Sequence, residues 1–145
     1  LVSQLTRDEV AVLMYPTERD GIISLLSYEN KNVRALIWQA KYRKDQKAFD
    51  LLGAVFANYV ETLGQVVLIP IPLSRARLRE RGYNQSLEIC RSVSKIVGCE
   101  VTDDVLFRIR HTNRQTELSR SERLKNLTIL NPNCQPKSIN FSNQN

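Results

Sequence analysis

The stretch that decides the fold runs from Gln65 to Gln85 and reads QVVLIPIPLSRARLRERGYNQ. Its first five residues, Gln65–Ile69, are mostly apolar and rich in β-branched side chains, which is typical of a strand buried on both faces of a parallel sheet. The sequence Pro70-Ile71-Pro72 excludes a helix and marks a sharp exit from that sheet. An arginine-rich polar segment then leads to Asn84, where helical periodicity begins. A strand, a loop and a helix in this order predict half of an α/β unit.

Helices are predicted on both sides of this stretch, because apolar residues recur there at intervals of three and four. Thr6 and Glu9 have the spacing of a capping box, and Gly64 and Gly98 follow apolar runs as stop signals. A second strand region is expected at Val101 and Val105–Ile109. The predicted helices are Thr6–Met14, Asn32–Tyr42, Asp45–Leu63 and Gln85–Val97.

The chain is therefore expected to be an α/β protein with a helical N-terminal part at 1–64 and the beginning of an α/β domain at 65–130. The remaining residues, 131–145, read NPNCQPKSINFSNQN and contain few apolar side chains. A segment of this composition buries too little surface to fold, so a disordered tail is predicted.

Composition excludes several classes of protein. The 145 residues are 42% hydrophobic and 25% charged, which fits one globular domain and not a collagen, a coiled coil or a disordered chain. No apolar run approaches the roughly 18 residues that span a bilayer, so no membrane partner is expected. The three cysteines, with His111 as the single histidine, favour neither a disulfide framework nor a four-ligand zinc site, and no metal ligand is assigned. A reducing, cytoplasmic location is predicted.

The positive charge is local. The net charge is +6, and two stretches account for it: Ser74–Arg81 has a net charge of +3 and Arg108–Lys125 one of +4, which leaves about −1 for the rest of the chain. Such clustering implies a bound anion, which is either a phosphorylated small molecule or the backbone of a nucleic acid.

The first basic stretch lies where ligands bind in open α/β sheets, beyond the carboxyl end of a strand and before a helix N-terminus. Gly82 permits a backbone conformation that other residues resist. In an extended loop, four arginines at every second position would share one side. They are Arg75, Arg77, Arg79 and Arg81. Because charge runs are usually solvated, spacing alone slightly favours a solvated basic loop.

The second basic stretch, Arg108–Asn126, reads RIRHTNRQTELSRSERLKN and has little apolar content. A mobile loop that carries arginine and glutamine can close over phosphates and exclude water. The alternative is an exposed loop followed by a short helix.

Several elements in a fixed order carry a family resemblance. They are IPIP at 69–72, RARLRERGYNQ at 75–85 and the pattern R-x-R-x-T-x-x-Q-x-x-L-x-x-x-x-R-x-x-N at 108–126, preceded by Tyr28, Val33–Ile37 and Lys41-Tyr42. Together they resemble the ComF family of phosphoribosyltransferase-like proteins, over about 28–126.

The resemblance implies a partial type I phosphoribosyltransferase fold, a Rossmann-like parallel sheet with flanking helices that binds phosphoribosyl pyrophosphate with Mg²⁺. It also implies a link to DNA uptake, and hence single-stranded DNA as a second partner. Thr112, Leu118 and Asn126 match the pattern of the loop that closes over the substrate. The residues expected to contact the substrate are Arg81, Gly82, Asn84, Gln85, Gln115 and Arg123.

Two features of the family are missing from the sequence. The cysteine-rich zinc module is absent, and Asn126 is not followed by an apolar strand, two adjacent acids and a Thr/Gly-rich turn. Asp103-Asp104 does not replace that signature, because no apolar strand leads into it. The chain is therefore expected to be a fragment that does not catalyse transfer, and neither a catalytic residue nor an acceptor is assigned. The alternatives are a natural short variant, a non-enzymatic basic nucleic-acid-binding module and a decayed gene product.

Overall fold

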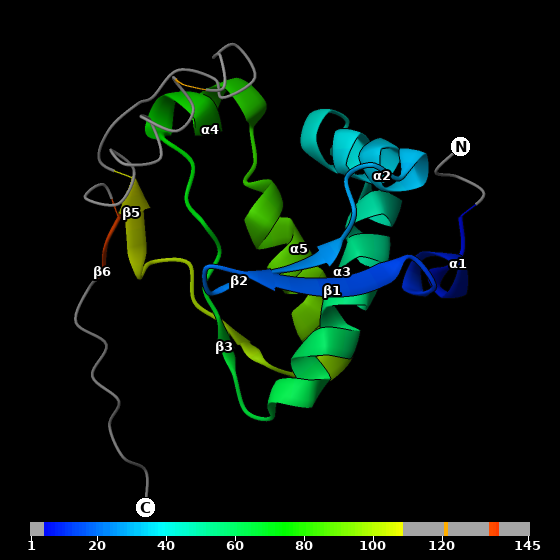
Figure 1. The fold of residues 1–145 in the computed structure, drawn as a ribbon. Coiled ribbons are helices and arrows are strands. Elements are labelled where there is room, and N and C mark those ends of the chain that lie inside the picture. Colours follow the sequence, from blue (N-terminus) through cyan, green and yellow to red (C-terminus); the bar gives the residue numbers. More distant parts are fainter. Residues whose placement is uncertain (1–4, 109–120, 122–133, 137–145) are drawn as a thin grey trace, which may run out of the picture.

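The structure is a computed structural model that describes residues 5–108, 121 and 134–136 (Figure 1). This part of the chain is a mixed α/β arrangement. Its elements are α1 (Arg7–Ala11), β1 (Met14–Arg19), β2 (Ile22–Leu26), α2 (Lys31–Tyr42), α3 (Gln46–Val60), the 3-10 turn η2 (Glu61–Leu63), β3 (Val67–Leu68), α4 (Arg75–Arg81), α5 (Gln85–Val97), β4 (Glu100–Val101), β5 (Leu106–Arg108) and β6 (Cys134–Pro136).

Three predicted helices are confirmed almost to the residue: α2, α3 and α5. Each begins at a side chain that accepts hydrogen bonds from the first free backbone N–H groups. These N-caps are Asn30, Asp45 and Asn84, and α5 ends at Gly98 as predicted.

The first predicted helix is wrong in its second half. Thr6 and Glu9 do form the capping box, but α1 ends at Ala11 and the chain continues as β1. β1 pairs with β2 in an antiparallel hairpin, for which Asp20 and Gly21 provide the turn with φ values of 52° and 74°. Two successive left-handed residues are what a tight two-residue hairpin requires. The N-terminal part is therefore not wholly helical.

The predicted parallel sheet is present only in part. β3 and β4 pair in parallel, with Val67 opposite Glu100 and Leu68 opposite Val101. Within the described ranges every sheet has two strands. The expectation of a strand buried on both faces was wrong, because Val67 is 47% exposed. β5 pairs with β6 in an antiparallel manner, and β6 lies in the segment predicted to be a disordered tail.

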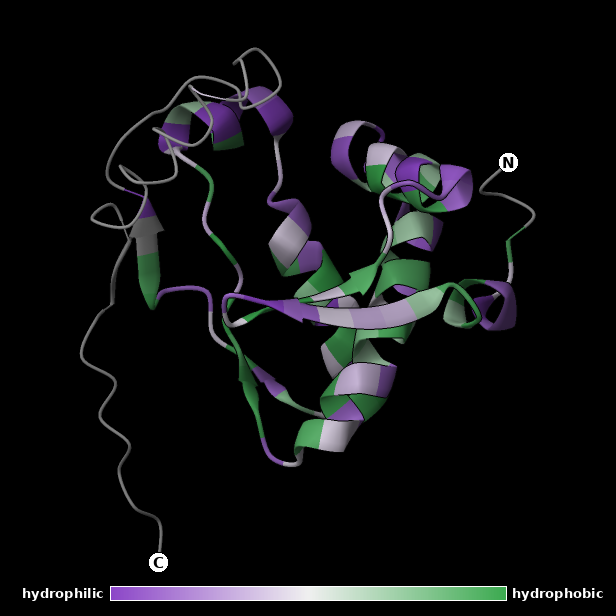
Figure 2. Cartoon of the chain, viewed as in Figure 1, coloured by the Kyte–Doolittle hydropathy of each residue, from purple (hydrophilic) through white to green (hydrophobic). Residues whose placement is uncertain are grey.

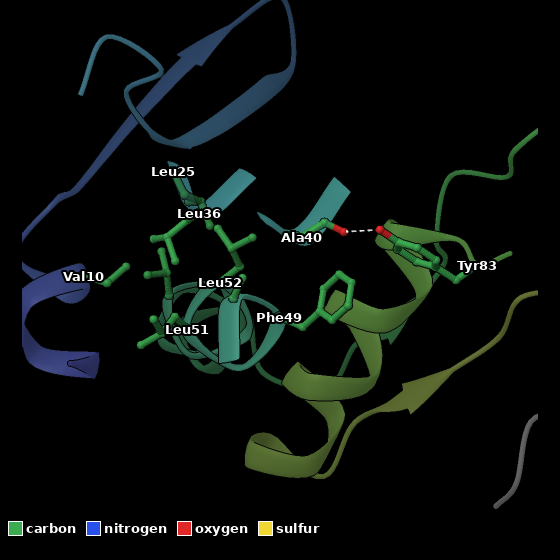
Figure 3. Close-up of a cluster of buried hydrophobic side chains, with 10 residues drawn as sticks. Val10, Leu25, Leu36, Ala40, Phe49, Leu51, Leu52 and Tyr83 are labelled. Carbon is green, nitrogen blue, oxygen red and sulfur yellow. Dashed lines mark hydrogen bonds between the residues drawn. The ribbon is translucent and has the colours of Figure 1, made fainter. Parts of the chain in front are cut away.

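The core is built around α3, which contacts α1, α2 and α5. From α3, Phe49, Leu51 and Leu52 join a cluster that also includes residues of α1, β2 and α2 (Figure 3). A second cluster joins α3 to α5 through Ala57, Val60 and Val93 and extends to Leu68 in β3. This packing holds α5 against α3. The segment that precedes α5, which includes α4 (Arg75–Arg81), is thereby attached to the core.

Candidate functional site

The arginine-rich stretch is a helix, α4, and not the extended loop that period-two spacing suggested. Ser74 caps its start by accepting a hydrogen bond from the Arg77 N–H at 3.3 Å, and Gly82 ends it with a left-handed φ of 80°. On a helix, residues four apart share a face and residues two apart do not. Arg75 and Arg79 therefore lie on one side of α4, and the four arginines are not aligned.

A groove of about 1100 Å³ lies beside α4. It is lined by residues of the segment after β3, of α4, of the start of α5, of the corner between α2 and α3, and of β5 with the segment before it. Figure 1 labels these helices and strands. Figure 2 shows how hydropathy changes along this part of the chain, from the hydrophobic β3 to the mostly hydrophilic α4. The basic residues that line the groove are Lys44, Arg75, Arg79, Arg91 and Arg108, and the acidic ones are Glu88 and Asp103.

Five basic residues face two acidic ones in the groove lining, and one acid, Glu88, is paired with one of the five, Arg91. Glu88 Oε1 accepts a hydrogen bond from Arg91 Nη1 at 2.9 Å across one turn of α5. The groove therefore carries excess positive charge in a concave surface, which raises the local concentration of anions.

The structure brings four of the six predicted contact residues together at the junction of α4 and α5. Gly82 and Asn84 line the groove, and the Arg81 guanidinium donates a hydrogen bond to Gln85 Oε1. The Arg81 guanidinium also lies 5.9 Å from the centre of the Tyr42 ring. Arg81 and Gln85 thus have partners within the protein, and their contact with a substrate stays a prediction.

Asn84 holds the junction in two directions. Its Oδ1 caps α5 by accepting from the Ser86 N–H at 3.1 Å, and its Nδ2 donates to the carbonyl oxygen of Ile71 at 3.0 Å. The second bond reaches across to the segment between the two prolines, Pro70 and Pro72, which line the groove. One side chain therefore fixes both the start of α5 and the path of the chain after β3.

Tyr83 is a site residue that the sequence did not identify as a contact. It is 8% exposed, and its hydroxyl donates to the Ala40 carbonyl oxygen at 2.8 Å (Figure 3). The Tyr83 hydroxyl oxygen in turn accepts a hydrogen bond from the Lys44 N–H at 3.2 Å. These partners lie about forty positions away along the chain, so no local pattern could indicate them.

Gln115 and Arg123 lie outside the described residues, as do Thr112, Leu118 and Asn126. Arg108, the first residue of their pattern, ends β5 and lines the groove.

Metal-ligating side chains do not cluster in the described part of the chain. No three side chains of histidine, cysteine, aspartate or glutamate gather closely enough there to hold a metal ion. Within the same residues, no helix is both long and apolar enough to cross a membrane.

A second surface feature lies on α2. Trp38 and Tyr42, one turn apart, are 46% and 54% exposed, with ring centres 5.8 Å apart. Cations lie near both rings: the Arg43 guanidinium is 5.3 Å from the centre of the Trp38 ring, and Lys41 Nζ is 5.3 Å from that of Tyr42. We call Trp38, Lys41, Tyr42, Arg43 and Arg81 the aromatic–basic patch.

Comparisons with protein-family models, with curated proteins and with solved structures gave no match.

Proposed function

We propose that this chain binds a phosphorylated small molecule of the phosphoribosyl pyrophosphate type in the groove. The observation that carries the proposal is the excess of basic side chains in a concave surface beside the parallel pair β3–β4. The carboxyl ends of parallel strands meet at one edge, and the segments after both strands line the groove. In open α/β sheets this edge is the usual place for a ligand.

The chemistry of the lining favours phosphate groups. Arg75 and Arg79 are exposed on one face of α4, and a guanidinium binds phosphate oxygens with two parallel hydrogen bonds. The ComF resemblance supports phosphoribosyl pyrophosphate among the possible phosphates. The proposal concerns binding and not transfer, because the sequence lacks the Thr/Gly-rich turn that the resemblance requires for the 5′-phosphate.

Calorimetric titration with inorganic pyrophosphate and with phosphoribosyl pyrophosphate, each with and without Mg²⁺, tests the proposal. We expect Arg75→Gln/Arg79→Gln to weaken binding at least tenfold, because a hydrogen bond to a charged group contributes about 1.5–3 kcal/mol. The matched control is Arg7→Gln/Arg19→Gln, which removes two exposed arginines from α1 and β1 and leaves the groove intact. A wild-type protein that binds neither compound at millimolar concentration would contradict the proposal, as would equal binding by the groove variant.

Single-stranded nucleic acid is a second candidate ligand, and the aromatic–basic patch favours it. Exposed rings interleaved with cations provide stacking surfaces for bases and charge for the backbone. The stretch Trp38–Arg43 precedes the arginines of α4 by more than thirty positions, and the contact between Arg81 and Tyr42 brings the two together. Tyr83 does not take part, since it is buried.

Trp38 is the single tryptophan of the chain, so its fluorescence reports directly on this patch. We expect a twelve-nucleotide oligothymidylate to quench it, with affinity that falls steeply as salt increases. Tyr42→Ala should weaken this binding about tenfold, because stacking contributes about 1–3 kcal/mol per base. Tyr15→Ala, which removes an exposed tyrosine from β1, is the matched control. Absence of quenching at low salt would rule out this candidate.

A further inference from the structure

Lys44 has an unusual backbone. It follows the last residue of α2 and its C-cap, Arg43, and its φ is 52°. Residues with a Cβ rarely adopt this left-handed conformation, and glycine is the usual residue just after a helix end. Asp20 is the other described non-glycine residue with positive φ, and the tight hairpin turn explains it. Because the backbone conformation at Lys44 suits glycine best, we ask what the lysine side chain contributes at this position.

Tyr83 holds Lys44 in place from a distant part of the chain. The Lys44 N–H donates to the Tyr83 hydroxyl oxygen, which itself donates to the Ala40 carbonyl oxygen in the last turn of α2. The Tyr83 ring packs edge-on against Phe49 in the core, with the ring centres 5.9 Å apart. The backbone of Lys44 is therefore connected to the core through one buried side chain.

The Lys44 side chain is held near the same ring. Its Nζ lies 5.7 Å from the centre of the Tyr83 ring, and both residues line the groove. A cation over an aromatic face is attracted to the ring and loses part of its rotational freedom. Lys44 thus brings a positive charge to the groove from the corner between α2 and α3, whereas Arg75 and Arg79 come from α4.

We propose that Lys44 is an anion-binding residue of the groove and that Tyr83 is the positioning residue that holds it there. This inference rests on the proposed function, since it assigns one of the groove's contacts to a phosphate oxygen. It explains why a cationic side chain occupies a backbone position that suits glycine. The lysine supplies a charge to the ligand at the expense of local backbone strain.

Titration of Lys44→Gly with inorganic pyrophosphate tests the inference. Glycine relieves the backbone strain, so we expect the variant to unfold at the same urea concentration as the wild type or a higher one. Its affinity for pyrophosphate should nevertheless fall about tenfold, as expected when a charge-assisted contact is lost. Lys44→Met, which keeps a long side chain without the charge, should lose the same affinity.

Two control variants test whether backbone strain alone, or the net charge of the protein alone, changes the affinity for pyrophosphate. Asp20→Gly relieves the other left-handed residue outside the groove, and Lys31→Gln removes one positive charge from the start of α2. Both should bind pyrophosphate as the wild type does.

The positioning role of Tyr83 is tested by Tyr83→Phe, which keeps the ring and removes the hydroxyl. We expect Tyr83→Phe to lower the affinity for pyrophosphate in the protein that has Lys44. It should not change the affinity further in the Lys44→Gly variant, because a positioning residue acts only through the residue that it positions.

The outcomes distinguish this inference from the proposed function. Wild-type binding that Lys44→Gly and Lys44→Met leave unchanged would overturn the role of Lys44 and leave the groove as the site. An equal effect of Tyr83→Phe with and without Lys44 would overturn the positioning role. A wild-type protein that does not bind pyrophosphate would overturn both the function and the inference.

Discussion

Gly53 of α3 lies directly against Ser92 of α5 at the point where the two helices cross. A Cβ at position 53 would be 2.5 Å from the Cβ of Ser92 and 3.1 Å from its carbonyl carbon. The Ser92 hydroxyl donates to Asp50 Oδ1 at 3.0 Å, and the same oxygen accepts from Gln46 Nε2 at 2.9 Å. This close contact sets the position of α5 on α3, and α5 begins at the groove.

Gly53→Ala is expected to destabilise the protein, although alanine normally stabilises a helix interior by about 0.5–1 kcal/mol. The steric conflict is larger, because an extra methyl group in a packed contact costs about 1–3 kcal/mol. Urea unfolding should therefore show a net loss of about 1–2 kcal/mol. The double variant Gly53→Ala/Ser92→Gly removes the nearest atom and should recover part of the loss. A more stable Gly53→Ala protein would contradict the close approach.

Asn84 allows its two roles to be separated by substitution. Asn84→Asp keeps the oxygen that caps α5 and loses the Nδ2 donor to Ile71, whereas Asn84→Ala loses both. We expect Asn84→Asp to cost about 1 kcal/mol for the hydrogen bond and Asn84→Ala about 1–2 kcal/mol more for the cap. Urea unfolding measures both, and pyrophosphate titration should find weaker binding in each, because the wall after β3 is released.

The matched control for Asn84 is Asn30, which caps α2 by accepting from the N–H groups of Asn32 and Val33. Asn30→Asp keeps this role and should change stability by less than about 0.5 kcal/mol. If Asn84→Asp were as neutral as Asn30→Asp, the bond to Ile71 would have no energetic importance.

The elements predicted well from sequence are those with local causes. Apolar periodicity and capping residues lie within each helix, which is why α2, α3 and α5 were placed correctly. The hairpin β1–β2 also has a local signal, Asp20-Gly21, but no element is predicted between Met14 and Asn32. The arginine stretch was assigned the wrong period, although Ser74 and Gly82 are an N-cap and a stop signal for a helix.

The candidate site was predicted only in part, because its geometry depends on contacts between distant residues. The sequence indicated the segment that forms α4 and its junction with α5, and the structure places Gly82 and Asn84 of that segment at the groove. It could not indicate that Tyr83 joins Ala40 and Lys44, since such a link depends on how α5 packs against α3. The role that we propose for Lys44 rests on this tertiary contact and on its φ, and neither is encoded by a local pattern.

Cys90 provides a prediction that depends on pH. Burial raises the pKa of the Cys90 thiol above its ordinary value of 9.0, and the neighbouring Cys99 raises it further. The rate of alkylation by iodoacetamide, followed at Cys90 by mass spectrometry, should therefore have a pH midpoint above 9.0 in the folded protein. In urea the midpoint should return to the value of a free thiol. The midpoint, and not the absolute rate, is the informative quantity, because burial also slows access of the reagent.

The same pKa determines how Cys90 affects stability. The folded state binds this proton more tightly than the unfolded state, so its contribution is fully present below the unfolded pKa and is lost as pH rises through the folded pKa. As the pH rises above 9.0 and through the raised folded pKa, the wild type should lose stability more steeply than Cys90→Ala, which lacks the titrating group. Urea unfolding at several pH values measures this difference. The wild type and Cys90→Ala could instead lose stability equally with pH, or the alkylation midpoint could be the same with and without urea. Either result would show that the packing of α5 does not shield the Cys90 thiol from water.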